Sequence, residues 1–382
     1  MKHYYYYIII MVAFLSCHIE KNSDMSRNSF SLENSLDLKA VHICQNIIIK
    51  SPIKLVLANN NLLIAQFRHD SLISVINLDD ENNNYMTAPK GIGPHDFYDL
   101  QNLIVMPKDS IIAIHDRNYR KYSYYKINND SVLLSDKTFI KNDFLKEKEM
   151  NTFPIPFDGD YVRYSINGRR MFTLNDKDLN ILEAFGDYPG DYPGNIIINK
   201  DHFPDFPLSE SDLFKLGHIN RIISNPQQNI LVAAGVWNDW LIFYKKNLNK
   251  MVLIKEYYTH DTFTIVTEDP LGTGGKTIGP KFTEQTIASY QDLYATEQHL
   301  YALYYGFPEL DKGNPDNTCY ILQFDWDGNY QKAYHLQEVI SHFAVDEERD
   351  CIYATYTAKG EDPVLLRYDI ISVPLNSGRV KY

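Results

Sequence analysis

Short apolar runs alternate with polar turns along most of the chain, and this alternation recurs as a longer unit. The unit consists of a polar turn, an apolar strand, a second polar turn and another apolar strand, and it occurs six times. The apolar runs are rich in Tyr, Ile, Val, Phe and Thr, which favour strands. The copies lie 49 to 70 residues apart, as measured between their first apolar residues, which are Leu62, Ile111, Met171, Ile230, Leu300 and Cys351.

A unit of this length has room for four short strands. Repeated four-stranded sheets arranged in a ring form a β-propeller, in which each sheet is a blade that packs against its neighbours. The pattern therefore predicts an all-β fold, a six-bladed β-propeller with four-stranded antiparallel blades, over residues 38–382. Length alone would suggest more than one domain, but six blades close into a single one.

Two related segments predict the joints between blades. Residues 90–97 read KGIGPHDF and residues 276–282 read KTIGPKF. Glycine can adopt a positive φ and proline fixes the next φ, so we expect a tight turn at each segment. Phe97 and Phe282 are then expected to pack between neighbouring sheets. The segment YPGDYPG, residues 188–194, is a third variant of the joint.

The ring of blades also needs a closure. A spare strand near Val41 to Lys50, with the sequence VHICQNIIIK, precedes the first repeat. Because an unpaired edge strand is a liability, we expect this strand to pair with the sixth blade beside LLRYDII, residues 365–371.

The N-terminus has the pattern of an export signal. Lys2 and His3 precede an apolar run of 12 residues, Tyr4 to Leu15, which is shorter than the roughly 20 residues of a membrane span. The run ends in FLSC at Cys17, which is similar to a bacterial lipobox, although Phe14 occupies the position where leucine is usual. We expect residues 1–16 to be a lipoprotein signal peptide, Cys17 to be lipidated and residues 17–37 to be a flexible tether. The alternative is an ordinary secretory peptide with an incidental cysteine.

Charge and cysteine usage narrow the class of protein. The formal net charge of −12 repels nucleic-acid backbones, so nucleic acid is not an expected partner. Besides Cys17, the chain has Cys44, Cys319 and Cys351. All three lie in apolar, alternating runs, where the role of a small buried hydrophobe is favoured over a disulfide or a metal ligand.

The relaxed lipobox, the Ser/Asn-rich tether, the six repeats and the GxGPxxF joint together resemble the TolB-like six-bladed propeller lipoproteins of bacterial cell envelopes. The resemblance covers residues 38–382. It implies a propeller fold and a lipid-anchored location in the cell envelope, with the outer membrane preferred. It implies no catalytic residue.

The sequence contains no convincing motif for catalysis or for metal or cofactor binding. PLGTGGKT, residues 270–277, fails as a phosphate-binding P-loop because Pro270 replaces the required glycine. His115 and Asp116 are favoured as a local hydrogen-bonded pair, and DWDGN, residues 325–329, as a hairpin turn. We therefore expect no cofactor and no metal.

The propeller geometry suggests where a ligand would bind. The joints between blades and the turns between second and third strands emerge on the same face. WNDW is the most suggestive segment on it, because two indole rings could stack on a sugar or clamp a peptide. The candidate binding residues on this face are Trp237, Asn238, Asp239, Trp240, His95, Asp96, Arg68, His69, Arg117 and Phe307. The alternative for WNDW is that its rings cover a blade edge.

Two functions remain open from the sequence. The first is a non-catalytic envelope lipoprotein, attached to the membrane by its lipid anchor, whose propeller binds a protein or a glycan. The second is a propeller hydrolase, lyase or lactonase with its active site at the mouth of the central channel. Three or more carboxylate or imidazole groups meeting near the channel would favour the enzyme.

Overall fold

The computed structural model describes most of the chain between residues 29 and 370. The described ranges are 29–44, 46–80, 83–93, 96–106, 111–116, 121–128, 131–139, 154–165, 169–189, 215, 217–225, 227–258, 265–270, 276–282, 284 and 286–370. Within these ranges, no helix is long and apolar enough to cross a membrane.

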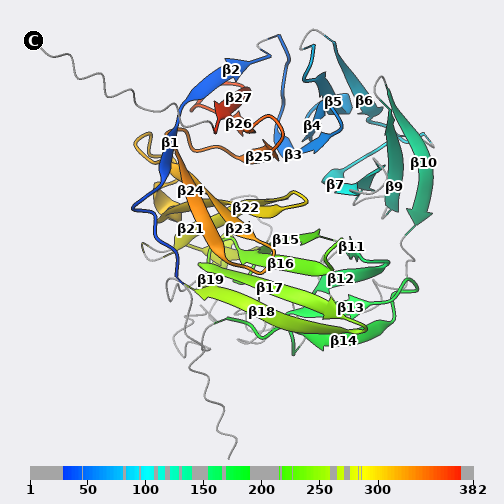
Figure 1. The fold of residues 1–382 in the computed structure, drawn as a ribbon, viewed down its shortest axis with the longest axis vertical. Helices are drawn as coiled ribbons and strands as arrows, with labels where there is room; N and C mark the ends of the chain where they lie inside the picture. Colours follow the sequence, from blue (N-terminus) through cyan, green and yellow to red (C-terminus); the bar gives the residue numbers. More distant parts are fainter. Residues whose placement is uncertain are drawn as a thin grey trace, which may run out of the picture.

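Six antiparallel sheets stand around a central axis, which confirms the six-bladed propeller (Figure 1). The first blade contains β3 (Pro52–Ala58), β4 (Asn61–Gln66), β5 (Ser71–Asn77) and β6 (Asn84–Pro89). The second contains β7 (Leu100–Met106), β8 (Ile111–Asp116), β9 (Lys121–Asn128) and β10 (Ser131–Phe139). The third contains β11 (Ile155–Phe157), β12 (Asp160–Tyr164), β13 (Phe172–Asn175) and β14 (Ile181–Phe185).

The other three blades complete the ring. The fourth contains β15 (Asn220–Asn225), β16 (Ile230–Gly235), β17 (Trp240–Asn247) and β18 (Lys250–Tyr258), and a separate hairpin of β19 (Ile265–Pro270) and β20 (Lys276–Lys281) follows it. The fifth contains β21 (Ile287–Ala295), β22 (His299–Pro308), β23 (Cys319–Asp325) and β24 (Tyr330–Leu336), with the short 3₁₀ helix η3 (Glu309–Asp311) between β22 and β23. The sixth contains β25 (His342–Asp346), β26 (Cys351–Tyr356) and β27 (Val364–Asp369) from the end of the described chain.

The second strand of a blade lies between two neighbouring sheets, so both of its faces are buried. Every residue of β4 and of β16 is buried for this reason. The apolar clusters accordingly lie between consecutive blades rather than inside one blade. One cluster joins the first and second blades and another joins the third and fourth.

The predicted closure of the ring is confirmed. β2 (Ala40–Ile43) pairs antiparallel with β27, with Ala40 opposite Tyr368, and becomes the fourth strand of the sixth blade. Figure 1 shows β2, from the start of the described chain, beside β26 and β27 from its end. The sixth blade is therefore assembled from both ends of the described chain.

The folded part begins earlier than residue 38, the start expected from the sequence. β1 (Leu36–Leu38) pairs in parallel with β24 and adds a fifth strand to the fifth blade. Upstream of it, the ring of Phe30 packs against Tyr304 with a centroid distance of 5.4 Å, and Tyr330 donates a hydrogen bond to the Ser31 carbonyl. Residues 29–38 thus form a strap along the fifth blade, although most of them were expected to belong to the tether.

The first joint packs as predicted, but its glycines act differently. Phe97 is completely buried in the cluster between the first two blades. Gly91 and Gly93 do not have a positive φ. They instead allow the Asp96 carboxylate to approach closely, because a Cβ added to Gly91 would lie 2.2 Å from its Oδ2.

The second predicted joint is wrong in its local structure. Residues 276–281 form β20 and pair with β19, so no tight turn occurs at this Ile-Gly-Pro segment. Phe282 is half-buried, and its ring lies 5.0 Å from that of Trp237. The third variant is described only as far as Pro189, whose carbonyl is 2.9 Å from His218 Nε2.

In the third blade, the repeated sequence unit is shifted by one strand relative to the other blades. In the other five blades, its first apolar residue belongs to the second strand, whereas Met171 lies directly before the third strand, β13. The polar turn before Met171 lies between the second and third strands, but in the sequence it resembles the turn between first and second strands. In this blade, that turn is at Asp158 and Gly159, which both have a positive φ.

Two cysteines behave as the sequence suggested. Cys319 and Cys351 are buried free thiols, and Cys44 is half-buried. Burial raises the pKa of the Cys319 thiol to about 12. This thiol therefore stays protonated and packs as a small apolar side chain.

Candidate functional site

The turns between first and second strands gather at one end of the central channel. In several blades these turns contain a residue in the left-handed conformation, namely Asn59, Asp158, Asn229 or Asp350. Asn and Asp tolerate that conformation better than other non-glycine residues, which explains why these turns are polar. The ring arrangement thus concentrates polar side chains around the axis on one face.

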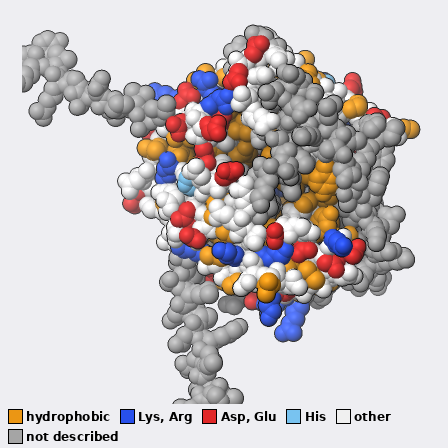
Figure 2. Space-filling model, turned by 45° about the vertical axis from the view of Figure 1, so that its right-hand side comes forward, with side chains coloured by type: hydrophobic (Ala, Val, Ile, Leu, Met, Phe, Trp, Pro, Cys, Tyr) orange, Lys and Arg blue, Asp and Glu red, His pale blue; other side chains and the backbone are white. Residues whose placement is uncertain are grey.

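A cavity of about 450 Å³ lies at this end of the channel, and we call it the channel mouth. Among the described residues, five of the six blades contribute to its walls, and no blade contributes more than five of them. Figure 2 shows acidic side chains beside a hollow at the centre of the described surface. The lining residues are Leu57, Asn59, Asn60, Val105, Ser224, Asn225, Gln227, Tyr294, Ala295, Thr296, Glu297, Gln298, Val345, Asp346, Glu347, Glu348 and Arg349.

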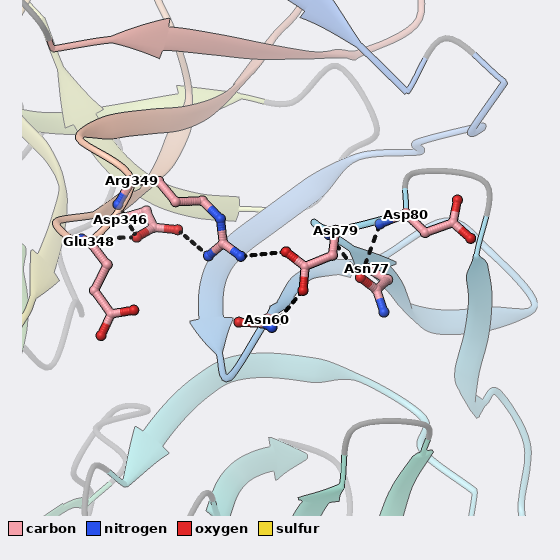
Figure 3. Close-up of polar contacts among 7 residues, drawn as sticks. All are labelled: Asn60, Asn77, Asp79, Asp80, Asp346, Glu348 and Arg349. Carbon is pink, nitrogen blue, oxygen red and sulfur yellow. Dashed lines mark hydrogen bonds and ion pairs between the residues drawn. The ribbon is translucent and has the colours of Figure 1, made fainter.

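Arg349 fixes one wall of the channel mouth across the seam between the sixth and first blades. Its guanidinium lies between two carboxylates, 3.0 Å from Asp346 Oδ2 and 2.7 Å from Asp79 Oδ1 (Figure 3). Asn60 holds the other oxygen of Asp79 at 2.6 Å. These hydrogen bonds, the one to Asp346 foremost, raise the pKa of Arg349 above its usual range. The charge of Arg349 is therefore already matched by its neighbours.

Glu347 is held in place by two side chains of the fifth blade. Its Oε1 lies 2.7 Å from His299 Nδ1 and accepts a hydrogen bond from the Tyr301 hydroxyl at 2.9 Å. Burial, together with the charge of Glu347, raises the pKa of Tyr301. The tyrosine thus remains a hydrogen-bond donor at any physiological pH and keeps the carboxylate oriented.

Asn225 presents a buried amide at the wall of the channel mouth. Its Oδ1 accepts hydrogen bonds from the backbone N–H groups of Gln227 and Gln228, at 3.1 and 3.3 Å. The residue is only 3% exposed, and its Nδ2 finds no acceptor among the described residues. A buried donor without an acceptor costs free energy, which makes this amide a candidate hydrogen-bond donor for a ligand at the channel mouth.

A second polar cluster lies deeper, on the innermost strands. Lys54 of β3 is 2.6 Å from Asp292 Oδ1 of β21, and His342 Nδ1 of β25 is 3.4 Å from Asp292 Oδ2. Burial alone would raise the pKa of Asp292, but Lys54 and His342 outweigh it and hold the pKa well below its usual range. Asp292 is therefore ionised and joins three blades electrostatically.

Carboxylates and imidazoles occur around the channel in the number that would suit an enzyme, but several of them are held by different partners. Asp292 and His342 provide one group of each kind in the channel wall, and Asp346 and Glu347 are each held by neighbours at the mouth. Among the described residues, no group of three or more His, Cys, Asp or Glu side chains is arranged to hold a metal ion.

The structure corrects the interpretation of WNDW. Trp240 is completely buried in the cluster between the third and fourth blades, because β17 begins at this residue and points it inward. Asn238 and Asp239 are also buried: Asn238 donates to the Gly217 carbonyl, and Asp239 accepts from the Tyr304 hydroxyl. Only Trp237 is partly exposed. The alternative reading, in which the rings cover a blade, is correct for Trp240.

The other candidate residues are spread over several blades. Arg68 is exposed in the first blade, where the neighbouring His69 accepts a hydrogen bond from the Ser71 N–H. Asp96 accepts a hydrogen bond from the Gly93 N–H in the first joint, and Phe307 stacks on Tyr305 with a centroid distance of 5.0 Å. None of these four lines the channel mouth. His95, Arg117 and Cys17 lie outside the described residues.

The channel mouth is on the face opposite to the one favoured by the sequence. In an antiparallel blade, the turn between first and second strands lies at the other end from the turn between second and third strands. The sequence did carry a signal for this site. The polar turn that begins a repeat reads NPQQN at 225–229, TEQH at 296–299 and DEERD at 346–350, and these turns form much of the wall.

Of the two motifs set aside on sequence grounds, DWDGN has the local role expected for it, and Asp116 has a structural role in the joint before β7. Asp116 is buried and accepts a hydrogen bond from the Tyr98 N–H at 2.7 Å. The DWDGN segment forms the turn between β23 and β24, where Gly328 has a φ of +77° and Asp325 accepts from the Asn329 N–H.

Comparison with known proteins agrees with this architecture. Residues 29–348 match the family model described as TolB-like 6-blade propeller-like. The chain belongs to this TolB-like family. No curated protein sequence matches this TolB-like propeller significantly.

Two solved structures share the fold of this TolB-like propeller. A presumed exported protein of Bacteroides fragilis NCTC 9343 is 14% identical, with a TM-score of 0.51, and the match covers 91% of this chain and 98% of that one. A member of the DUF4221 family from Bacteroides vulgatus ATCC 8482 is 11% identical, with a TM-score of 0.52, and the match covers 89% and 98%. At these identities the similarity concerns the fold.

Proposed function

We propose that this TolB-like propeller is an exported lipoprotein of the bacterial cell envelope whose propeller is a binding module for an envelope protein or glycan. The channel mouth is the binding site in this proposal. The observation that carries it is the wall of polar side chains from four blades, several of them already fixed by neighbours. Such preorganisation lowers the entropic cost of binding.

The lipid anchor in this proposal is supported by the N-terminal sequence, in which a short basic start and an apolar run precede Cys17. A lipid-modified N-terminus gives stable membrane attachment when more than one acyl chain is present.

Replacing Cys17 by Ala is expected to abolish the anchor. Because acylation requires the thiol, the Cys17→Ala protein should carry no fatty-acid label and should leave the membrane fraction or remain unprocessed. Metabolic labelling with a fatty-acid analogue, followed by fractionation, measures this. Cys44→Ala is the matched control and should keep the label. Equal labelling of the parent and the Cys17 variant would exclude the anchor.

The binding site can be located by photo-crosslinking in intact cells. Gln298 is exposed and lines the channel mouth, whereas Glu361 is exposed in the turn between β26 and β27, on the opposite face. A photoreactive amino acid at position 298 is expected to form crosslinks to a protein or glycan partner, and the same amino acid at position 361 should form few. Crosslinks at 361 alone would place the binding site on the other face, and crosslinks at neither would argue against a binding module.

A further inference from the structure

The channel mouth has a strong charge imbalance. Among the described lining residues, four carboxylates come from Glu297, Asp346, Glu347 and Glu348, and one guanidinium comes from Arg349. The formal charge of the described lining is therefore −3. Since Arg349 is already bound between Asp346 and Asp79, it is not available to an anionic ligand.

Two of these carboxylates remain accessible to a cation. Glu297 and Glu348 are both exposed, and neither takes part in an ion pair within the part of the chain that the structure describes. Among the described residues, the Glu297 carboxylate accepts only a long hydrogen bond of 3.3 Å from Gln227 Nε2. Figure 3 shows the carboxylate of Glu348 pointing away from the Arg349 network.

Asn225 gives independent information about the chemistry of the ligand. Asn225 is one of the lining residues, and its buried Nδ2 has no acceptor among the described protein atoms. A ligand that reaches this amide would therefore supply an acceptor oxygen. A carboxylate or phosphate would satisfy Asn225 but would be repelled by the acidic wall, so a neutral acceptor such as an amide carbonyl fits better.

We infer that the channel mouth binds a short peptide segment that carries a lysine or arginine. A backbone carbonyl of the segment accepts the hydrogen bond of Asn225, and its cationic side chain pairs with Glu297 and Glu348. The cavity of about 450 Å³ lies in the usual range for small ligands, about 300–1,000 Å³, so it holds a few residues of a tail or loop rather than a folded domain. This inference rests on the proposed binding function and names its partner chemistry.

The test uses the purified full chain and fluorescent peptides in anisotropy titrations. The probe is acetyl-Gly-Lys-Gly-Lys-Gly-amide, and its neutral counterpart has glutamine in place of both lysines. The Glu297→Gln/Glu348→Gln variant is expected to bind the lysine peptide about tenfold more weakly, and added salt should weaken the parent's binding. The matched control is Glu361→Gln/Asp362→Asn, which makes the same charge change on two exposed residues of the opposite face. It should change binding by less than about twofold.

Four results would overturn the inference. Equal binding of the lysine and glutamine peptides would remove the role of charge, and equal binding by the two double variants would place the cation elsewhere. Preferential binding of a neutral chitotetraose probe that competes at the same site would identify a glycan as the partner. Crosslinking from position 298 without peptide binding would leave the binding module in place and refute only this peptide chemistry.

Discussion

Replacing Trp240 by Ala is expected to lower the free energy of unfolding by about 3–5 kcal/mol, the usual cost of deleting a large aromatic side chain from a core. The ring is completely buried between the third and fourth blades, in the same apolar cluster as Phe172 and Met251. Its removal would leave a cavity at a joint where two sheets support each other. Urea unfolding followed by tyrosine fluorescence measures the loss.

Trp237→Ala is the matched control for this prediction. Trp237 is half-buried and contacts Phe282, outside the core cluster that contains Trp240. Its substitution should therefore cost less than about 2 kcal/mol. An equal loss in both variants would mean that Trp237 is also a core residue, and no loss in Trp240→Ala would contradict the burial of Trp240 between the two blades.

Replacing Lys54 by Met is expected to cost about 3 kcal/mol at neutral pH. Lys54 and Asp292 form an ion pair between the first and fifth blades, with side chains that are 14% and 7% exposed. Removing one partner leaves a buried carboxylate without its main counterion, and such a change typically costs about 3–5 kcal/mol. His342, at 3.4 Å, remains as a weaker partner and keeps the loss near the lower end.

The pH dependence distinguishes this cause from lost packing. The pKa of Asp292 is lowered in the folded protein, so its ion pair contributes stability above the unfolded pKa of about 3.9 and loses it as the pH falls toward the folded pKa. In Lys54→Met the unopposed burial raises the pKa of Asp292. The difference between parent and variant should therefore be largest near pH 7 and should narrow below about pH 4.

A double variant provides the control for the lysine substitution. Lys54→Met/Asp292→Asn removes both charges, so most of the lost stability should return. A double variant that is as unstable as Lys54→Met would show that packing of the lysine stem, rather than the buried charge, is responsible.

The sequence was sufficient for the architecture because a propeller repeats its pattern. Strands such as β4 and β16 are recognisable in the sequence as short apolar runs between polar turns. The spare strand before the first repeat predicted the closure with β27. Local propensity and repetition determine these features. The third repeat was shifted because two of its turns are similarly polar, and spacing alone could not distinguish them.

The site was harder to predict because its residues meet only after the ring has closed. Asn60, Asn225 and Glu348 belong to three different blades, and nothing in their separate turns specifies that one cavity collects them. The two indole rings in WNDW led the sequence analysis to predict the binding site at that turn instead. Whether such a ring faces solvent or the next sheet depends on where the strand begins, and β17 begins at Trp240 itself.

The seam between β2 and β27 also has a consequence for biosynthesis. β2 leaves the ribosome among the first folded segments, but its partner emerges only when nearly the whole described chain has been made. Until then, β2 and the growing row of blades have open hydrogen-bonding edges, which are the surfaces that favour aggregation. A chain interrupted before residue 364 would lack the last strand of the seam. Such a chain could not complete its ring and would be a natural substrate for chaperones and proteases.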